Sequence, residues 1–129
     1  MVKVAELEKK CAQIMELDPK MRSARIINNR GHLVAGGMKK GLQSLEKQKQ
    51  DEMMFMELAL RVRMRHEFDN EFGEVHFSLS YRDKIIVMSF PLANDDVCLV
   101  SSEKDLDFGK IPFQILKILA PLKKNPSTF

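Results

Sequence analysis

The sequence predicts one α+β domain in which a five-stranded antiparallel sheet is sandwiched between helices. In the segment before Gly73 the apolar residues recur every three to four positions, and after it they recur at every second position, which marks a change from helix to strand. The predicted elements follow the order α-β-β-α-β-β-β-α. A length of 129 residues, with 44% hydrophobic and 30% charged residues, suits one globular domain that buries a core, so residues 1–129 are expected to form a single domain.

Three elements are expected before the long middle helix. Apolar residues at helical spacing predict an amphipathic helix from about Val2 to Leu17, which Pro19 ends. A short strand at residues 24–28 and a second one at residues 33–35 flank a turn signal that contains Gly31. These two strands are expected to form a hairpin.

The hairpin segment NNRGHLVAGGMKKG, residues 28–41, has the glycine spacing of a phosphate-binding loop. Gly37 and Met38 stand where that motif needs a lysine and a hydroxyl residue, and a strand pattern occupies the loop itself. The glycines are therefore assigned to the backbone. Gly31 is expected to make the hairpin turn, and Gly36 with Gly37 to end an edge strand.

A long helix is expected from Asp51 to about Phe72, because acidic residues favour a helix start and Gly73 is a typical C-terminal capping residue. A mobile basic loop over about residues 37–50 is expected to lead into it. The remaining elements are three strands and a helix, expected at residues 75–81, 85–92, 97–100 and 111–119. The alternating strand belongs at an edge of the sheet and the two strands that are apolar on both faces belong in its middle. A short flexible tail is expected at about residues 123–129.

Composition and spacing disfavour several classes of function. A net charge of +3 is mild for a nucleic-acid binder, and the three histidines lack zinc-site spacing. Cys11 and Cys98 are expected to be reduced core residues, with a redox pair joining the first helix to the sheet as the less favoured alternative. No apolar run has transmembrane length and no signal-peptide pattern begins the chain, so a cytoplasmic protein without membrane contact is expected.

The long helix is apolar around most of its circumference. One stripe is expected to lie on the sheet and consists of Met53, Met56, Leu60, Met64 and Phe68. Further apolar positions lie away from it, at Met54, Phe55, Leu58, Ala59 and Val62. Either the first helix or the basic loop covers this second surface, or a partner or second copy does. The partner interpretation is favoured, because uncovered apolar patches mark interfaces and methionines repack easily.

Charged and polar residues next to this surface extend the candidate interface. Arg61 and Arg65 share its face, and pairing with Glu57 and Asp69 four residues away is the favoured account of both arginines. The polar face of the strand that follows Gly73 is a candidate dimer edge. The candidate interface comprises Met54, Leu58, Arg61, Val62, Arg65, Glu74, His76 and Ser78.

The order of elements and several local motifs resemble a known family. The matching features are Ile26-Ile27-Asn28, the turn at Gly31, the following Leu33-Val34-Ala35-Gly36, the long helix that ends at Gly73, and the apolar strands at 85–92 and 97–100. Together they resemble the Roadblock (dynein light-chain) domain and its longin and profilin-like relatives. The hairpin pattern N-x-x-G-x-L-V-A-G-G is also similar to that of small uncharacterised archaeal proteins.

The Roadblock resemblance implies a fold and a role. It implies that the middle helix covers one face of the sheet and the terminal helices the other, and that the protein forms homodimers through the middle helix and the edge of the third strand. It also implies a regulatory or scaffolding role, with a small Ras-like GTPase as a partner, and it carries over no catalytic residue. No cofactor and no metal are expected from the residues.

Two other functions stay open. One is a profilin-like domain that senses a small molecule in a cavity between sheet and helix. The other is weak nucleic-acid binding through the basic loop, which contributes Lys39, Lys40, Lys47 and Lys49, together with Arg30. An enzyme is the least favoured interpretation.

Overall fold

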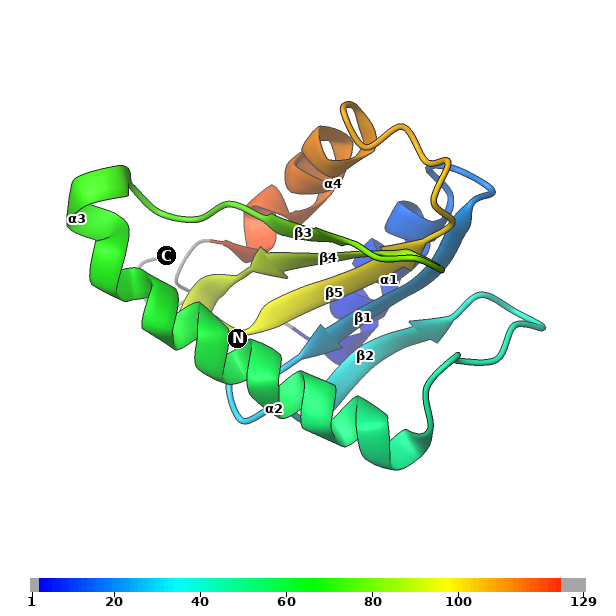
Figure 1. The fold of residues 1–129 in the computed structure, drawn as a ribbon, viewed down its shortest axis with the longest axis horizontal. Helices are drawn as coiled ribbons and strands as arrows, with labels where there is room; N and C mark the ends of the chain where they lie inside the picture. The colour runs from blue at the N-terminus through cyan, green and yellow to red at the C-terminus, as the bar shows by residue number, and fades with distance from the viewer. Residues whose placement is uncertain (1–2, 124–129) are drawn as a thin grey trace.

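A five-stranded antiparallel sheet forms the centre of the molecule (Figure 1), in a computed structural model that describes residues 3–123. The strands are β1 (Met21–Ile27), β2 (Leu33–Met38), β3 (Ser78–Tyr81), β4 (Ile86–Pro91) and β5 (Val97–Ser102). Their order across the sheet is β2-β1-β5-β4-β3, with every neighbouring pair antiparallel. The predicted fold class is confirmed, and so is the prediction that the two doubly apolar strands lie inside the sheet while the alternating strand lies at its edge.

Helices cover both faces of this sheet. They are α1 (Val4–Met15), α2 (Gln48–Arg65), the short α3 (Asp69–Phe72) and α4 (Ile111–Leu119). A 3-10 turn at His66–Phe68 interrupts the predicted long helix between α2 and α3. In Figure 1, α1 and α4 lie behind the sheet and α2 crosses its front. The sandwich that the Roadblock resemblance implies is therefore present.

Two apolar cores hold the layers together. The larger one joins α1 and α4 to the back of the sheet and includes the fully buried Ile14, Met88, Phe90, Val100, Ile115 and Leu119. The smaller one joins α2 to the front of the sheet and consists of Ile27, Phe55, Leu58, Val62, Val97 and Leu99. Alternate residues of β5 serve the two cores, which is why this strand is apolar on both faces.

Both cysteines lie in the larger core as free, buried thiols. Burial, with the nearby charge of Glu8, raises the pKa of Cys11 to about 11. Burial also raises the pKa of Cys98 well above its ordinary value. Because the thiolate is the reactive form of cysteine, both side chains are held in their unreactive form.

The hairpin between β1 and β2 differs from the prediction at its second strand. β2 continues through both glycines to Met38, with Gly36 opposite Arg25 and Gly37 opposite Ala24. The prediction that these glycines end the strand is wrong, because their backbone groups still pair with β1. The connection to α2 is correspondingly shorter and spans residues 39–47. The predicted start of the first helix at Val2 and nearly all of the predicted tail, residues 124–129, lie outside the described residues.

Two of the glycines permit close packing. Gly31 has a φ of +81°, and a Cβ there would lie 3.0 Å from the backbone of Met56, so the hairpin turn touches α2 directly. Gly36 has a φ of +83°, and a Cβ there would lie 2.1 Å from the carbonyl oxygen of Ala24 and 2.9 Å from Sγ of Cys11. The two glycines thus allow the hairpin to pack closely against α1 and α2.

Candidate interaction surface

Helix α2 carries two apolar stripes on opposite sides, and the structure assigns them in the reverse of the predicted sense. The side that faces the sheet contains Phe55, Leu58, Ala59 and Val62, which are 6%, 9%, 2% and 2% exposed. Leu58 and Val62 were expected on the free side as interface residues. That expectation is wrong, because both pack against Ile27, Val97 and Leu99 of the sheet.

The opposite side of α2 is an exposed apolar stripe that we call the outer stripe. Its members are Met53, Met56, Leu60 and Met64 of α2 with Phe68 of the following 3-10 turn, which are 65%, 64%, 52%, 63% and 55% exposed. At about 100° per residue the centre of this stripe lies roughly 180° from Phe55 and Val62. Phe72 follows one turn later at 83% exposure, and its ring stacks on that of Phe68 with centroids 6.0 Å apart.

Close packing explains which of the two apolar sides of α2 faces the sheet. Ala59 provides a small side chain in the middle of the inner side, and the Gly31 turn lies against the helix backbone at Met56. Both stripes are apolar, so the periodicity alone does not choose between them.

The other predicted interface residues of α2 lie at its flanks. Met54 is partly buried against the smaller core. Arg61 is exposed and its Nε lies 3.2 Å from Oε1 of Glu57, which confirms the predicted pair. The predicted pair of Arg65 with Asp69 is not formed; Asp69 contacts His66 instead, and no acceptor within residues 3–123 lies within reach of the buried Nη1 of Arg65.

The remaining predicted residues lie at the β3 edge of the sheet. Glu74 and His76 are exposed in the extended segment before β3, and Ser78 begins the strand opposite Ser89 of β4. In the part of the chain that the structure describes, β3 has a paired strand only on its β4 side. Gly73, with a φ of +80°, ends the helical segment before it. Whether this edge binds a second copy stays a prediction.

A histidine clamp that the sequence analysis did not single out fixes the end of α2. Nδ1 of His66 lies 2.7 Å from Oδ2 of Asp69, and Nε2 lies 2.7 Å from Oδ1 of Asp95 in the β4–β5 turn. These hydrogen bonds to Asp69 and Asp95 raise the pKa of His66 above its ordinary value. The spacing of His66 to Asp69 was visible in the sequence, but the contact with Asp95 depends on the fold.

A buried arginine, also missed, joins the sheet to α2. Arg25 of β1 is 6% exposed, and its guanidinium lies 3.4 Å from Oδ1 of Asp51 and 3.7 Å from Oε2 of Glu46. It also lies 5.2 Å from the ring centroid of Phe55. An arginine within the apolar strand Ala24-Arg25-Ile26 was the sequence signal that could have identified it.

Comparison with known families identifies the chain. The sequence model of a family of unknown function, DUF6659, matches residues 1–125. The chain belongs to this family. Comparison with curated proteins gives no match to the DUF6659 chain.

Solved structures show which fold the DUF6659 chain has. MglB of Myxococcus xanthus is similar with a TM-score of 0.73 at 12% identity, covering 99% of this chain and 100% of that one. The gliding protein MglB of Thermus thermophilus gives 0.72 at 10% identity, covering 93% and 90%. A Roadblock/LC7 domain of Streptomyces avermitilis gives 0.67 at 11% identity, covering 88% and 92%. The fold is that of the Roadblock/LC7 domain.

Metal and membrane sites find no support in the described part of the DUF6659 chain. Within residues 3–123 no group of three or more His, Cys, Asp or Glu side chains is arranged to hold a metal ion. Oδ1 of Asp95 lies 2.7 Å from Nε2 of His66, and Oδ1 of Asp96 accepts a hydrogen bond from the backbone amide of Asn29. No helix in this range combines the length and apolarity needed to cross a bilayer.

The histidine clamp predicts a pH-dependent stability for the DUF6659 domain. Because the pKa of His66 is raised on folding, its contribution is fully present below about 6.5, the ordinary value, and is lost as the pH rises through the raised folded pKa. We expect the difference in unfolding free energy between wild type and His66→Gln to become smaller as the pH rises through the folded pKa of His66. Urea unfolding of both proteins at a series of pH values measures this difference.

A second variant at a residue that contacts His66 serves as the control for this measurement. Asp69 and Asp95 accept its hydrogen bonds, and Arg65 lies beside it in a shallow surface hollow. Asp95→Asn should therefore remove part of the same pH dependence. A stability difference that stays constant from about pH 6 to 9 would contradict a protonated clamp.

Proposed function

We propose that this chain is a non-enzymatic regulatory module that forms a homodimer through the outer stripe of α2 and binds a small Ras-like GTPase. The observation that carries the proposal is the outer stripe itself. Five large apolar side chains, each more than half exposed, form one row of roughly 22 Å along α2 and the 3-10 turn that follows it. Contiguous exposed apolar surface of this kind marks an interaction site.

The spacing of the stripe suits self-association about a two-fold axis. Its members run from Met53 to Phe68, with Leu60 at the centre. If two α2 helices pack antiparallel, Leu60 meets its counterpart and the Met53 end of one copy meets the Phe68 end of the other, as a self-complementary interface requires. Flexible methionines adapt to such a contact. A solved MglB structure, similar with a TM-score of 0.72, is described as having a tetrameric arrangement.

The β3 edge is proposed as a second element of the same assembly. Unpaired strand edges are templates for pairing with another chain. Ser78 begins this edge strand, and Glu74 and His76 are exposed in the extended segment before it, so pairing that continues into this segment would bring these polar residues against a second copy. Arg61 is proposed to lie at the rim of the α2 contact.

The choice of partner class rests on the Roadblock resemblance. That resemblance implies regulatory proteins that act on small Ras-like GTPases and contribute no shared catalytic residues. We accordingly place the chemistry of GTP on the partner and the binding surface on this chain, with the cytoplasm as the proposed compartment.

Two measurements test the proposed function. Sedimentation of the wild-type protein at micromolar concentration should give the mass of a dimer, and a monomer there would contradict self-association. A pull-down from extracts of the native cell, loaded with either a GTP analogue or GDP, should retain a small GTPase in one nucleotide state. Recovery of other proteins without any GTPase would contradict the partner class while leaving the dimer intact.

A further inference from the structure

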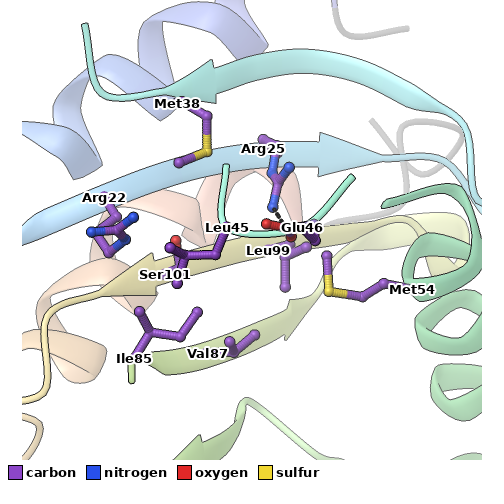
Figure 2. Close-up of a pocket in the computed structure, with 10 residues that line it drawn as sticks. All are labelled: Arg22, Arg25, Met38, Leu45, Glu46, Met54, Ile85, Val87, Leu99 and Ser101. Carbon is purple, nitrogen blue, oxygen red and sulfur yellow. Dashed lines mark ion pairs between the residues drawn. The ribbon is translucent and has the colours of Figure 1, made fainter. Parts of the chain in front are cut away.

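The front face of the sheet has a groove beside α2 that the proposed interface does not use. Figure 2 shows this central groove, whose walls include Arg22 and Arg25 of β1, Val87 of β4, Leu99 of β5, and Leu45 with Glu46 from the connection that precedes α2. With Leu45 and Glu46 in place, the free space in the groove is about 20 Å³, room for about one water molecule. Its wall is mainly apolar with a few polar groups, as small-molecule sites are.

Arg25 supplies a buried and incompletely satisfied cation to this groove. Only 7% of its side chain is exposed, yet its contacts with Asp51 and Glu46 are 3.4 Å and 3.7 Å long. Charge-assisted hydrogen bonds to carboxylates are ordinarily about 2.7–2.9 Å. Within residues 3–123 no acceptor lies within hydrogen-bond distance of its buried Nε. A buried donor without a partner costs about 1–3 kcal/mol, so a better-placed acceptor would be favoured.

Residues 39–47 form a strap that places a carboxylate near this cation. Glu46 extends from the strap toward Arg25, and Leu45 lies beside Ser101 at the groove wall (Figure 2). Leu45 is 56% exposed, so the strap makes only a partial apolar contact. The strap therefore presents an aliphatic side chain and a carboxylate to the groove, in a loose arrangement.

We propose that the central groove is a binding site for a small aliphatic carboxylate, which takes the place of Glu46 on the guanidinium of Arg25. The aliphatic part of the ligand lies against Val87 and Met54, in the space that Leu45 and Glu46 leave when the strap moves out. The exchange replaces one carboxylate by another and leaves the charge around Arg25 unchanged. It also frees the strap, which leads directly into α2. The site does not depend on the proposed dimer.

The charges around the groove select a monocarboxylate over a more highly charged anion. The other basic wall residue, Arg22, is already engaged, with Nη1 2.8 Å from Oε2 of Glu103. Asp51 stays close to the bound anion, and burial together with the neighbouring Glu46 raises the pKa of Asp51 above its ordinary value. A phosphate group would bring a second negative charge against these carboxylates without a second free cation.

A titration with 4-methylpentanoate tests the site. Amide chemical shifts of the full chain are followed by NMR at neutral pH, with 4-methylpentanamide as the uncharged control of the same shape. We expect saturable shifts at Arg25, Leu99, Ser101 and the strap with the carboxylate only. Glu46→Gln removes the internal competitor, so the dissociation constant should fall on the order of tenfold.

Several results of these titrations would contradict the proposed carboxylate site. Equal binding of the amide, no saturable shift in either wild type or Glu46→Gln, or saturable shifts confined to other surfaces would each exclude the site. Arg25→Lys keeps the charge but loses the planar fork, so it should weaken binding on the order of tenfold. An unchanged affinity in folded Arg25→Lys would also overturn it. If this variant fails to fold, the comparison of wild type with Glu46→Gln decides.

Discussion

Replacing Leu60 by glutamate is expected to convert the proposed dimer into a monomer while leaving the fold intact. Leu60 is 52% exposed at the centre of the outer stripe, so the substitution removes no contact from either core. In the proposed antiparallel contact, the two-fold axis brings the two new carboxylates against each other in an apolar interface. Burying an unpaired charge costs several kcal/mol. A loss of about 3 kcal/mol of binding free energy raises the dissociation constant of the dimer more than 100-fold.

Sedimentation of Leu60→Glu at micromolar concentration measures this change. The matched control is Val4→Glu, which places the same charge at a residue of similar exposure, 54%, on α1 behind the sheet. The control should remain a dimer and both variants should keep the circular dichroism spectrum of the wild type. If Leu60→Glu sediments as a dimer, the outer stripe is not the contact between copies.

Replacing Gly36 by alanine is expected to destabilise the domain by about 2–5 kcal/mol. The left-handed φ of +83° costs a non-glycine residue about 1–2 kcal/mol. The added Cβ would also lie 2.1 Å from the carbonyl oxygen of Ala24, a backbone atom that cannot rotate away. Forcing an extra carbon into such a packed site costs a further 1–3 kcal/mol or so. A domain of ordinary stability, about 5–15 kcal/mol, would lose a large share of its margin.

The neighbouring glycine provides the control for this prediction. A Cβ at Gly37 would meet no heavy atom within 4 Å, and Gly37 has no positive φ. Gly37→Ala should therefore change the stability by no more than about 0.5 kcal/mol. Urea unfolding of both variants at one protein concentration measures the difference, since the proposed dimer would make stability depend on concentration. Equal stabilities for the two variants would show that β2 moves away to relieve the contact.

The positions of the strands could be predicted from the sequence because a strand's burial on one or both faces sets the spacing of its apolar residues. β5 is apolar at every position from Val97 to Val100, so it had to lie inside the sheet between two cores. The strand after Gly73 alternates, and it lies at the edge. The hairpin turn at Gly31 and the end of the helical segment at Gly73 were likewise visible, because both need a positive φ that glycine adopts most readily.

The candidate sites were harder to predict from the sequence because they depend on contacts between residues that are distant along the chain. Glu57 and Arg61 are four residues apart on one helix, and their pairing was predicted correctly. Arg25 meets Asp51 and Glu46 from more than 20 positions away, and no periodic pattern records such contacts. The clamp of His66 on Asp95 joins two elements in the same way.

The order of the elements, the edge and central strands, and the two apolar sides of α2 follow from the pattern of residues along the chain. Which of those sides faces the sheet depends on packing between elements. Ala59 and the Gly31 turn allow the inner side to approach closely, and the methionines of the outer stripe are left at the surface. The physical reason is that hydrophobicity gives a stripe its tendency to be buried, whereas shape decides which of two apolar stripes fits against a given neighbour.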